Sequence, residues 1–389
     1  MMDKWMFDES ATTDPAHGKA PSERSVEELL AGGIILLDKP FGPTSHQVSA
    51  WARDLLGLDK MGHGGTLDPF ATGVLPLLAG KAMRMTKSLL THQKTYIAVL
   101  KFSNAVDEDT LVEIMKRLRG RIYNVPPTVS AVKVQVRSRT IHQFELIDIK
   151  DNLAVVKIDC DAGTYVRTMA RDLGLFIGEE VELTELRRTR SGNYVEQQNL
   201  SLSQIADAVW LWKEKQDDSA MRKIIHPLEV MTASMPEIVV KDAAISALAH
   251  GAPLARPGIV SASKGVTKGS DVRLMSLKGE LIAVAEMIVD SDQLTVMKKG
   301  EVAKSVTVIM MPDVYPKGWT SPPPHESASA EVVSPAVEVD SQETIENPIT
   351  LPSLSELGKM KKAELVELCD NAGLETKGTK AVLIERLTQ

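Results

Sequence analysis

Short apolar and β-branched runs alternate with amphipathic helical patterns over residues 31–232, and this alternation constrains the fold more than any other feature of the chain. The strand-like runs are Ile34–Leu37, Tyr96–Phe102 and Ala154–Cys160. Some neighbouring runs are separated by helical patterns, whereas others have hairpin-like neighbours. We therefore expect an α+β unit built around a mixed sheet.

Local signals mark where the helices of this unit begin and end. The expected helices run from Thr44 to Gly57, from Thr110 to Gly120 and from Thr164 to Gly178. Thr44 can supply an N-cap, and Thr110 with Glu113 reads as a capping box. A glycine ends each helix because it readily adopts the left-handed backbone of a C-cap.

Composition divides the 389 residues into five parts. They are a polar leader (1–30), the alternating unit (31–232), a region of short strands between Gly and Pro turns (236–320), a Ser-, Pro- and Glu-rich segment without aromatics (321–350) and a helical end (351–389). The spacing of short strands predicts a small β-barrel in the third part. The fourth is expected to be a disordered linker, since it has little to bury.

The net charge of −7 is unusual for a protein that binds nucleic acid, because phosphate contacts require Lys and Arg. Most of this charge is local. Six acidic residues and no Lys or Arg lie between Pro322 and Thr350: Glu326, Glu331, Glu338, Asp340, Glu343 and Glu346. The rest of the chain is nearly neutral, so charge neither supports nor excludes RNA binding.

Several classes of protein are not expected from composition. No run approaches about 18 consecutive apolar residues, so no transmembrane helix and no membrane partner are expected. The leader lacks the apolar segment of a secretory signal. Only Cys160 and Cys369 occur, which excludes a disulfide framework or a four-cysteine zinc site within the chain. A reducing compartment, the cytoplasm, is therefore expected.

Three short motifs contain residue types suited to chemistry. Asp68 lies in the Gly- and Pro-rich run Gly62–Pro69, where backbone can approach a ligand closely, although an Asp-Pro turn would look the same. Arg167 follows Gly-Thr-Tyr near a helix start, where a cation gains nothing from the helix dipole. It is either the partner of an anion or a surface residue. Tyr96, in Lys-Thr-Tyr, would by itself indicate packing.

Together these motifs resemble the TruB-type pseudouridine synthases. The matching segments are Gly-His-x-Gly-Thr-Leu-Asp-Pro ending at Pro69, Lys-x-Tyr ending at Tyr96, Gly-Thr-Tyr-x-Arg ending at Arg167 and Leu-Arg-Arg ending at Arg188. The resemblance is closer to the dyskerin branch, the catalytic subunit of box H/ACA ribonucleoproteins. That match is carried by residues 37–46, by Val-Pro-Pro-x-x-Ser-Ala-Val-Lys from Val125 and by the stretch from Val308 to Trp319.

The resemblance implies roles for seven residues. Asp68 would be the carboxylate nucleophile, Arg167 its ion-pair partner and Tyr96 the ring that stacks on the extruded base. Tyr165, Leu186 and Lys94 would line the substrate pocket, and His63 would fill the space vacated in the RNA. The reaction oxidises nothing and hydrolyses no phosphate, so neither a metal nor a redox cofactor is expected. Whether the Asp attacks the sugar or abstracts a proton to give a glycal stays open.

Residues with other expected roles are few. Lys39 and Pro40 are expected to shape the loop beneath the site, His46 to belong to core or helix packing, and Cys160 to be a buried strand residue.

The flanking parts also show resemblances. Residues 236–320 resemble a PUA domain, with an expected closing strand at Val306–Met311, and in the dyskerin branch the leader commonly packs on that domain. Residues 351–389 resemble a SAP motif that presents several lysines to a nucleic acid, or else form a helical hairpin for protein contact.

The dyskerin resemblance implies ribosomal RNA as the substrate and an H/ACA guide RNA. Partner proteins of the Gar type, the Nop type and the L7 kink-turn family are implied as well. Two alternatives are a stand-alone synthase for the TΨC arm of transfer RNA and a catalytically silent RNA scaffold.

Overall fold

The structure is a computed structural model that describes residues 3–125 and 135–317 together with five isolated later positions, Cys369, Thr379, Lys380, Val382 and Ile384. The expected linker, nearly all of the expected SAP motif and most of the Val-Pro-Pro segment lie outside the described residues. By its contacts the chain divides into Met1–Ser321 and Pro322–Gln389, and the elements described below belong to the first unit.

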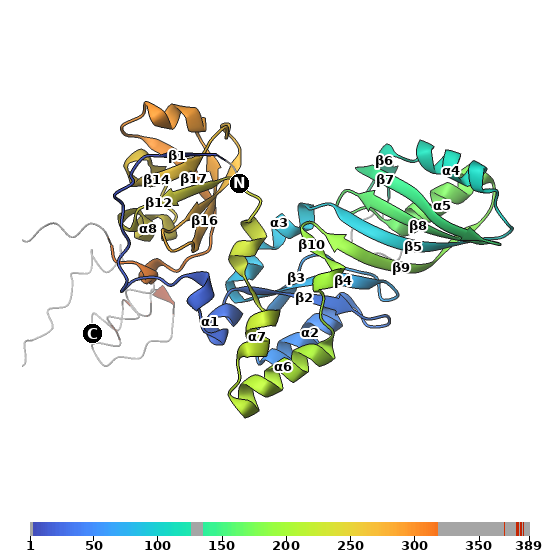
Figure 1. Cartoon of the computed structure of the whole chain (residues 1–389), viewed down its shortest axis with the longest axis horizontal. Coiled ribbons are helices and arrows are strands. Elements are labelled where there is room, and N and C mark those ends of the chain that lie inside the picture. The colour runs from blue at the N-terminus through green and yellow to red at the C-terminus, as the bar shows by residue number, and fades with distance from the viewer. Residues whose placement is uncertain are drawn as a thin grey trace, which may run out of the picture. The chain divides into compact units, whose positions relative to one another are not determined.

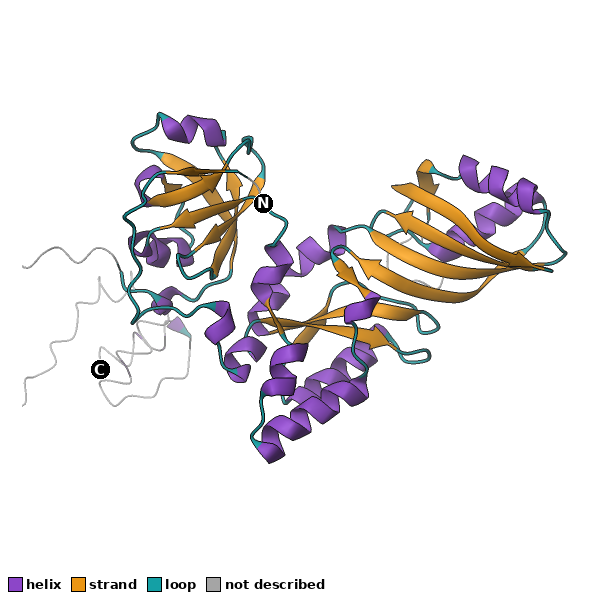
Figure 2. Cartoon of the chain, viewed as in Figure 1, coloured by secondary structure: helices purple, strands orange, loops and turns teal. Residues whose placement is uncertain are grey.

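A mixed sheet of ten strands organises the larger part of the described chain (Figures 1 and 2). Its main order is β11 (His226–Pro227), β2 (Gly33–Lys39), β4 (Thr72–Ala79), β9 (Val181–Ser191), β5 (Lys94–Phe102), β8 (Leu153–Cys160), β7 (Arg137–Lys150) and β6 (Gly120–Asn124), with β3 (Met61–His63) on β4 and β10 (Tyr194–Val195) on β9. Only β4 and β9 pair in parallel, and the other pairs are antiparallel. The expected α+β unit is thus confirmed.

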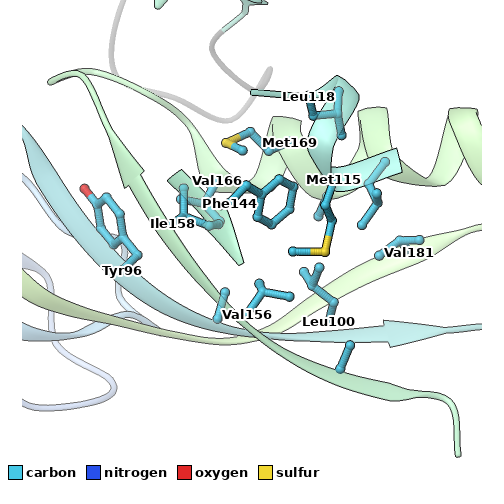
Figure 3. Packing of buried hydrophobic residues seen from close by; sticks show 14 of the residues in the cluster. Tyr96, Leu100, Met115, Leu118, Phe144, Val156, Ile158, Val166, Met169 and Val181 are labelled. Atoms are coloured by element: carbon cyan, nitrogen blue, oxygen red, sulfur yellow. The ribbon is translucent and has the colours of Figure 1, made fainter. Parts of the chain in front are cut away.

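Each half of this sheet has its own helices and its own core. α4 (Glu108–Arg117) and α5 (Val166–Ile177) cover β5, β8 and β7, and Figure 3 shows Phe144, Met115 and Leu100 packed between them. α2 (Ser45–Leu56), α6 (Leu202–Lys215), α7 (Ser219–Ile224) and α1 (Val26–Leu30) cover the half that contains β2 and β4. The described helices include none that is both long and apolar enough to cross a membrane.

The two halves meet where β4 runs beside β9. Gly73 pairs with Arg188 at this seam, and its φ of +100° lies in the region that favours glycine. A Cβ at position 73 would lie 2.2 Å from the carbonyl oxygen of Arg188. Only glycine therefore allows the two backbones to approach this closely.

Helix boundaries were predicted well at two of three places. Thr44 caps α2 and Gly57 ends it with φ +70°, and Gly178 ends α5 in the same way. For the third helix, both the capping box at Thr110 and the end at Gly120 were wrong, because α4 ends at Arg117 with Leu118 as its C-cap and Gly120 begins β6. The cap of α4 is Asp107, whose carboxylate accepts the backbone N–H of Thr110 (2.9 Å) and its hydroxyl (2.8 Å). The earlier acidic residue accepts both bonds, so the helix begins before Thr110.

A second sheet of seven strands forms the small β-rich domain, with α8 (Asp242–Ala249) packed in its core. Its order is β1 (Lys4–Met6), β14 (Ile259–Ser263), β12 (Glu237–Val240), β15 (Asp271–Met275), β16 (Leu281–Met287), β17 (Glu301–Val308) and β13 (Leu254–Ala255). The last long strand spans Glu301–Val308, so the expected strand Val306–Met311 was placed too late. Ile309 and Met310 follow it as buried residues.

The polar leader is part of this β-rich domain. β1 pairs antiparallel with β14 through Trp5 and its two neighbours. Farther along the leader, Nζ of Lys278 donates to the carbonyls of Asp14, His17 and Gly18, and a carboxylate oxygen of Glu280 accepts the N–H of Lys19 at 3.0 Å. The β15–β16 turn therefore holds the leader in place.

Glu229 connects three segments of the chain. Its carboxylate accepts both terminal nitrogens of Arg24 in the leader, at 2.8 and 3.0 Å, and the backbone N–H of Leu281 at the start of β16, at 3.1 Å. The Arg24 and Glu229 side chains are only 15% and 10% exposed. They line a cavity of about 360 Å³, none of whose lining residues belongs to the Asp68 loop.

We predict that Glu229→Gln loosens the leader, because it removes the charge from a shielded two-bond ion pair. Loss of one partner of such a pair costs about 3 kcal/mol when it is fully buried, and somewhat less at this exposure. Hydrogen exchange of residues 14–24 should accelerate. The control is Glu113→Gln, which removes only exposed pairs with Lys116 and Arg117. Unchanged exchange in Glu229→Gln would show that the leader is held by its other contacts.

Candidate active site

The loop that carries Asp68 runs from β3 to β4 and is held by two fully buried side chains. Ser45, in the first turn of α2, accepts the N–H of Leu67 at 2.8 Å and donates to the carbonyl of the same residue at 3.1 Å. Nζ of Lys39 donates to three carbonyls at 2.8 to 3.0 Å, including those of Pro69 and Ala71. The backbone on both sides of Asp68 is therefore held, and Lys39 shapes the loop as expected.

Arg167 reaches Asp68 from a distant part of the chain. It stands in the first turn of α5, and its Nη2 lies 2.5 Å from Oδ1 of Asp68. The guanidinium also lies over the ring of Phe70, at 5.5 Å from the centroid. The side chains of Asp68 and Arg167 are 39% and 37% exposed, so the pair is open to a molecule arriving from solvent.

Asn124 holds the start of α5 in position. This residue, which was not singled out from the sequence, is buried at the end of β6. Its Oδ1 accepts the N–H of Tyr165 at 2.8 Å and its Nδ2 donates to the carbonyl of Tyr165 at 3.3 Å. Its place directly before Val125 of the dyskerin-like segment was the sequence signal that could have identified it. The half-buried Tyr165 is thereby fixed two residues from Arg167.

Tyr96 and Leu186 lie in the core cluster that extends to the Asp68 loop. Both are buried, at 9% and 7% exposed, and the cluster includes Leu67, the residue before Asp68. In Figure 3 the Tyr96 hydroxyl points away from the apolar side chains. Burial raises the pKa of this hydroxyl, while nearby Arg188 opposes the rise. Tyr96 therefore holds its proton at neutral pH.

Lys94 occupies a different position from the one expected of a substrate contact. It is 5% exposed, and its Nζ donates to the carbonyls of Leu89 (2.9 Å) and His92 (2.7 Å). Burial, followed by the charge of Arg188, lowers the pKa of Lys94 to about 8. These contacts favour a structural role, in which Lys94 secures the turn before β5.

The side chains of His63, the last residue of β3, and His46, in the first turn of α2, are in contact. Their rings contact edge to face with centroids 4.8 Å apart. Burial, followed by the nearby His46 and Arg188, lowers the pKa of His63 to about 4, so its ring is neutral at physiological pH. His46 is exposed on the first turn of α2, which corrects its assignment to core or helix packing. Its place at N2 of α2, between the buried Ser45 and Val48, turns it outward.

The arginines of the Leu-Arg-Arg segment point to opposite sides of β9. Arg187 pairs with Asp38 (3.0 Å) and with Glu196 (2.7 Å) on the partly exposed side. Arg188 is 1% exposed and donates to the carbonyls of Val74 (2.8 Å) and Gly65 (3.0 Å). The sequence motif contained Arg188, but its burial beneath the Asp68 loop could not be read from it.

Two further observations concern Cys160 and metal binding. Cys160 is buried in β8, as expected, and burial raises its pKa to about 12, which keeps the thiol protonated. Across the described ranges, no group of three His, Cys, Asp or Glu side chains is placed to hold a metal ion.

Comparison with protein-family models accounts for most of the chain. The TruB family pseudouridylate synthase N-terminal domain matches residues 53–166, and the tRNA pseudouridylate synthase B C-terminal domain matches 167–233. A PUA domain matches residues 236–309, a DKCLD domain 1–49 and a SAP domain 356–389.

Curated relatives match over nearly their whole length. A "Probable tRNA pseudouridine synthase B" of Pyrobaculum aerophilum is 40% identical over 324 residues, covering 83% of this chain and 97% of the relative. A protein of the same description from Methanosarcina barkeri is 39% identical, covering 80% and 92%.

Solved structures match to a similar extent. "Structure of H/ACA RNP bound to a substrate RNA containing 2'-deoxyuridine" aligns with TM-score 0.75 and 36% identity over 82% of this chain and 98% of that one. "Crystal Structure of a Cbf5-Nop10-Gar1 Complex" aligns with TM-score 0.74 and 38% identity over 81% and 96%. With the domain matches and the geometry around Asp68, these relatives show that the chain belongs to the TruB family of pseudouridine synthases, as a dyskerin-type member, and is a uridine-to-pseudouridine isomerase.

Proposed function

We propose that the enzyme isomerises uridines of ribosomal RNA that an H/ACA guide RNA selects. We further propose that it works with Nop-type, Gar-type and L7-family kink-turn proteins. The observation that carries this proposal is the alignment, over about four fifths of the chain, with proteins whose structures are described as H/ACA RNP, Nop10-Cbf5 and Cbf5-Nop10-Gar1 complexes. The match of residues 1–49 to a DKCLD domain supports the same assignment.

In this proposal Asp68 is the nucleophile. Its carboxylate is accessible, held by the backbone contacts of Ser45 and Lys39, and paired with Arg167. An ionised carboxylate so placed can act on the ribose of a uridine, and Arg167 orients it and balances its charge. The extruded uridine, unstacked at a cost of a few kcal/mol, would stack on Tyr96. Tyr165 and Leu186 would line its pocket, and His63 would take its place in the RNA.

A second candidate function is modification of the TΨC arm of transfer RNA without a guide. It is favoured by the curated relatives, which are described as probable tRNA pseudouridine synthases. The two candidates share the chemistry at Asp68 and differ only in how the RNA is presented. We also propose that the SAP region, matched at residues 356–389, contacts a further nucleic acid and that the enzyme acts in the cytoplasm.

The guide requirement can be tested with 5-tritiated uridine, which releases tritium when C5 bonds to the ribose. The full chain with the three partner proteins should release tritium from a ribosomal RNA fragment only when the guide pairs with that fragment. A guide with a mismatched pocket sequence is the control. Equal release without guide would contradict guided selection. Release from transfer RNA alone would favour the second candidate, and Asp68→Asn should be inactive on both RNAs.

We predict that Arg167→Ala removes most turnover and affects RNA affinity less. The reason is that Asp68 loses its charge partner while the RNA loses one contact at most; a fall of about 100-fold or more is expected for such a preorganised charge. Arg171→Ala is the matched control, since Arg171 lies on the same helix but pairs with its neighbour Asp172 at the surface. An equal loss of turnover and RNA affinity in Arg167→Ala would argue against this role.

We predict that Ser45→Ala lowers turnover because the Asp68 loop loses both bonds to Leu67. Each bond contributes about 1 kcal/mol, so an effect of about tenfold or more on single-turnover rate is expected. Ser49→Ala is the control, since Ser49 is buried on the same helix but its hydroxyl has no hydrogen-bond partner in the described structure. Similar rates for the two variants would show that Ser45 does not position the loop.

A further inference from the structure

Three cations are buried around the floor of the Asp68 loop. Lys39, Lys94 and Arg188 are 0%, 5% and 1% exposed. The hydrogen bonds of both lysines, and those from Nε and Nη2 of Arg188, end on backbone carbonyls. Within residues 3–125 and 135–317, none of the three forms an ion pair with a carboxylate. The floor of the site therefore carries positive charge without a direct counter-ion.

Burial of these three charges lowers the stability of the folded protein. A buried charge without a counter-ion costs several kcal/mol, and carbonyl dipoles offset only part of this. Burial and the charge of Arg188 both lower the pKa of Lys94, and burial is also the main reason that the pKa of Lys39 falls to about 8. Asp68 acts on Lys39 in the opposite direction. The positive floor is thus close enough to the site to interact with charge there.

The reaction places negative charge on the base. When the bond between N1 and C1′ breaks, its electron pair stays on N1, and uracil becomes an anion delocalised over N1, O2 and O4. C1′ either gains a bond to the Asp68 carboxylate or, after loss of the C2′ proton to that carboxylate, becomes part of a double bond. The uracil anion then bonds to C1′ through C5, while the bond from C1′ to Asp68 breaks or, on the second route, Asp68 returns the proton to C2′. The C5 proton then leaves and N1 gains one. Both routes pass through the same anion.

We propose that Arg188 is a positioning residue that stabilises this uracil anion through Tyr96. The two residues are cross-strand neighbours on β5 and β9. The guanidinium is held by Val74 and Gly65, while Arg188 itself is too deeply buried to touch RNA. Its fixed charge polarises the Tyr96 hydroxyl and acts on the base that this ring contacts. The inference rests on the proposed function's placement of the base against Tyr96.

The test uses an RNA that the unaltered enzyme modifies, and it compares uridine with 5-fluorouridine at the target position of that RNA. Fluorine at C5 stabilises the uracil anion, so 5-fluorouridine needs less help from the protein. For the full-length Arg188→Met variant, the single-turnover rate on uridine should fall by about 100-fold and that on 5-fluorouridine by about 10-fold. Arg188→Lys, which keeps the charge, should recover part of the difference. Rates are those at which the starting nucleoside disappears in chromatography of nuclease digests, because C5 of 5-fluorouridine carries fluorine and has no proton to lose.

The control is Arg187→Met, on the same strand but paired with Asp38 and Glu196. It removes a structural arginine, so any slowing should be equal for the two nucleosides. Equal slowing by Arg188→Met, or no recovery in Arg188→Lys, would overturn the inference. If Arg188→Met does not fold, Tyr96→Phe provides the test instead. Loss of the hydroxyl should lower the single-turnover rate on uridine more than the rate on 5-fluorouridine. Equal slowing there would also overturn it.

One further variant separates this inference from the proposed function. Tyr96→Leu removes the ring that is proposed to hold the base. If it leaves both rates unchanged, the placement of the base against Tyr96 is wrong, and the inference falls with it. If it abolishes turnover while Arg188→Met slows both nucleosides equally, the placement stands and only the role of Arg188 is refuted.

Discussion

The parallel pairing of β4 with β9 joins the two halves of the catalytic sheet, and the site depends on it. Asp68 belongs to the half built on β2 and β4, whereas Arg167 belongs to the half built on β5, β8 and β9. The two residues are 99 positions apart in the numbering, and no local interaction could bring them within 2.5 Å. Gly73 makes the seam possible because any side chain there would collide with the backbone of Arg188.

The same seam also explains why so much charge is buried. Arg188 crosses from β9 to the carbonyls of β4 and of the Asp68 loop, and Lys39 reaches the same loop from β2. Backbone carbonyls in an irregular loop have no strand partner, so they need donors to replace water. Cationic side chains supply several donors each. Their charge also lies beside the place where, in our proposal, negative charge forms on the base during cleavage of the glycosidic bond.

Two kinds of contact join the β-rich domain to the catalytic part: hydrogen bonds made by Glu229 and a cluster of apolar side chains. Glu229 lies between the two and binds both Arg24 of the leader and the backbone of β16. The outer face of β2 and β4, with Ile34 and Leu78, packs in one cluster with Leu281 and Ile309. This cluster buries apolar side chains of the catalytic sheet together with side chains of the β-rich domain. The leader also adds β1 to the edge of the seven-stranded sheet, although more than 200 residues separate β1 from the rest of that sheet in the sequence.

Local sequence was sufficient for what local physics controls. Thr44 and Gly57 marked the ends of α2, the apolar runs marked β2, β5 and β8, and the four motifs, which contain Asp68, Tyr96 and Arg167, indicated the family. Two local details were still missed, since Asp107 rather than Thr110 caps α4 and Lys94 donates to the carbonyls of Leu89 and His92. Tertiary structure alone decided the rest: Arg167 reaches Asp68, and Arg188 lies fully buried against the carbonyls of Val74 and Gly65 while its neighbour Arg187 does not. These outcomes depend on which backbone atoms a side chain meets after the sheet closes, and that information is held in contacts between residues far apart in the chain.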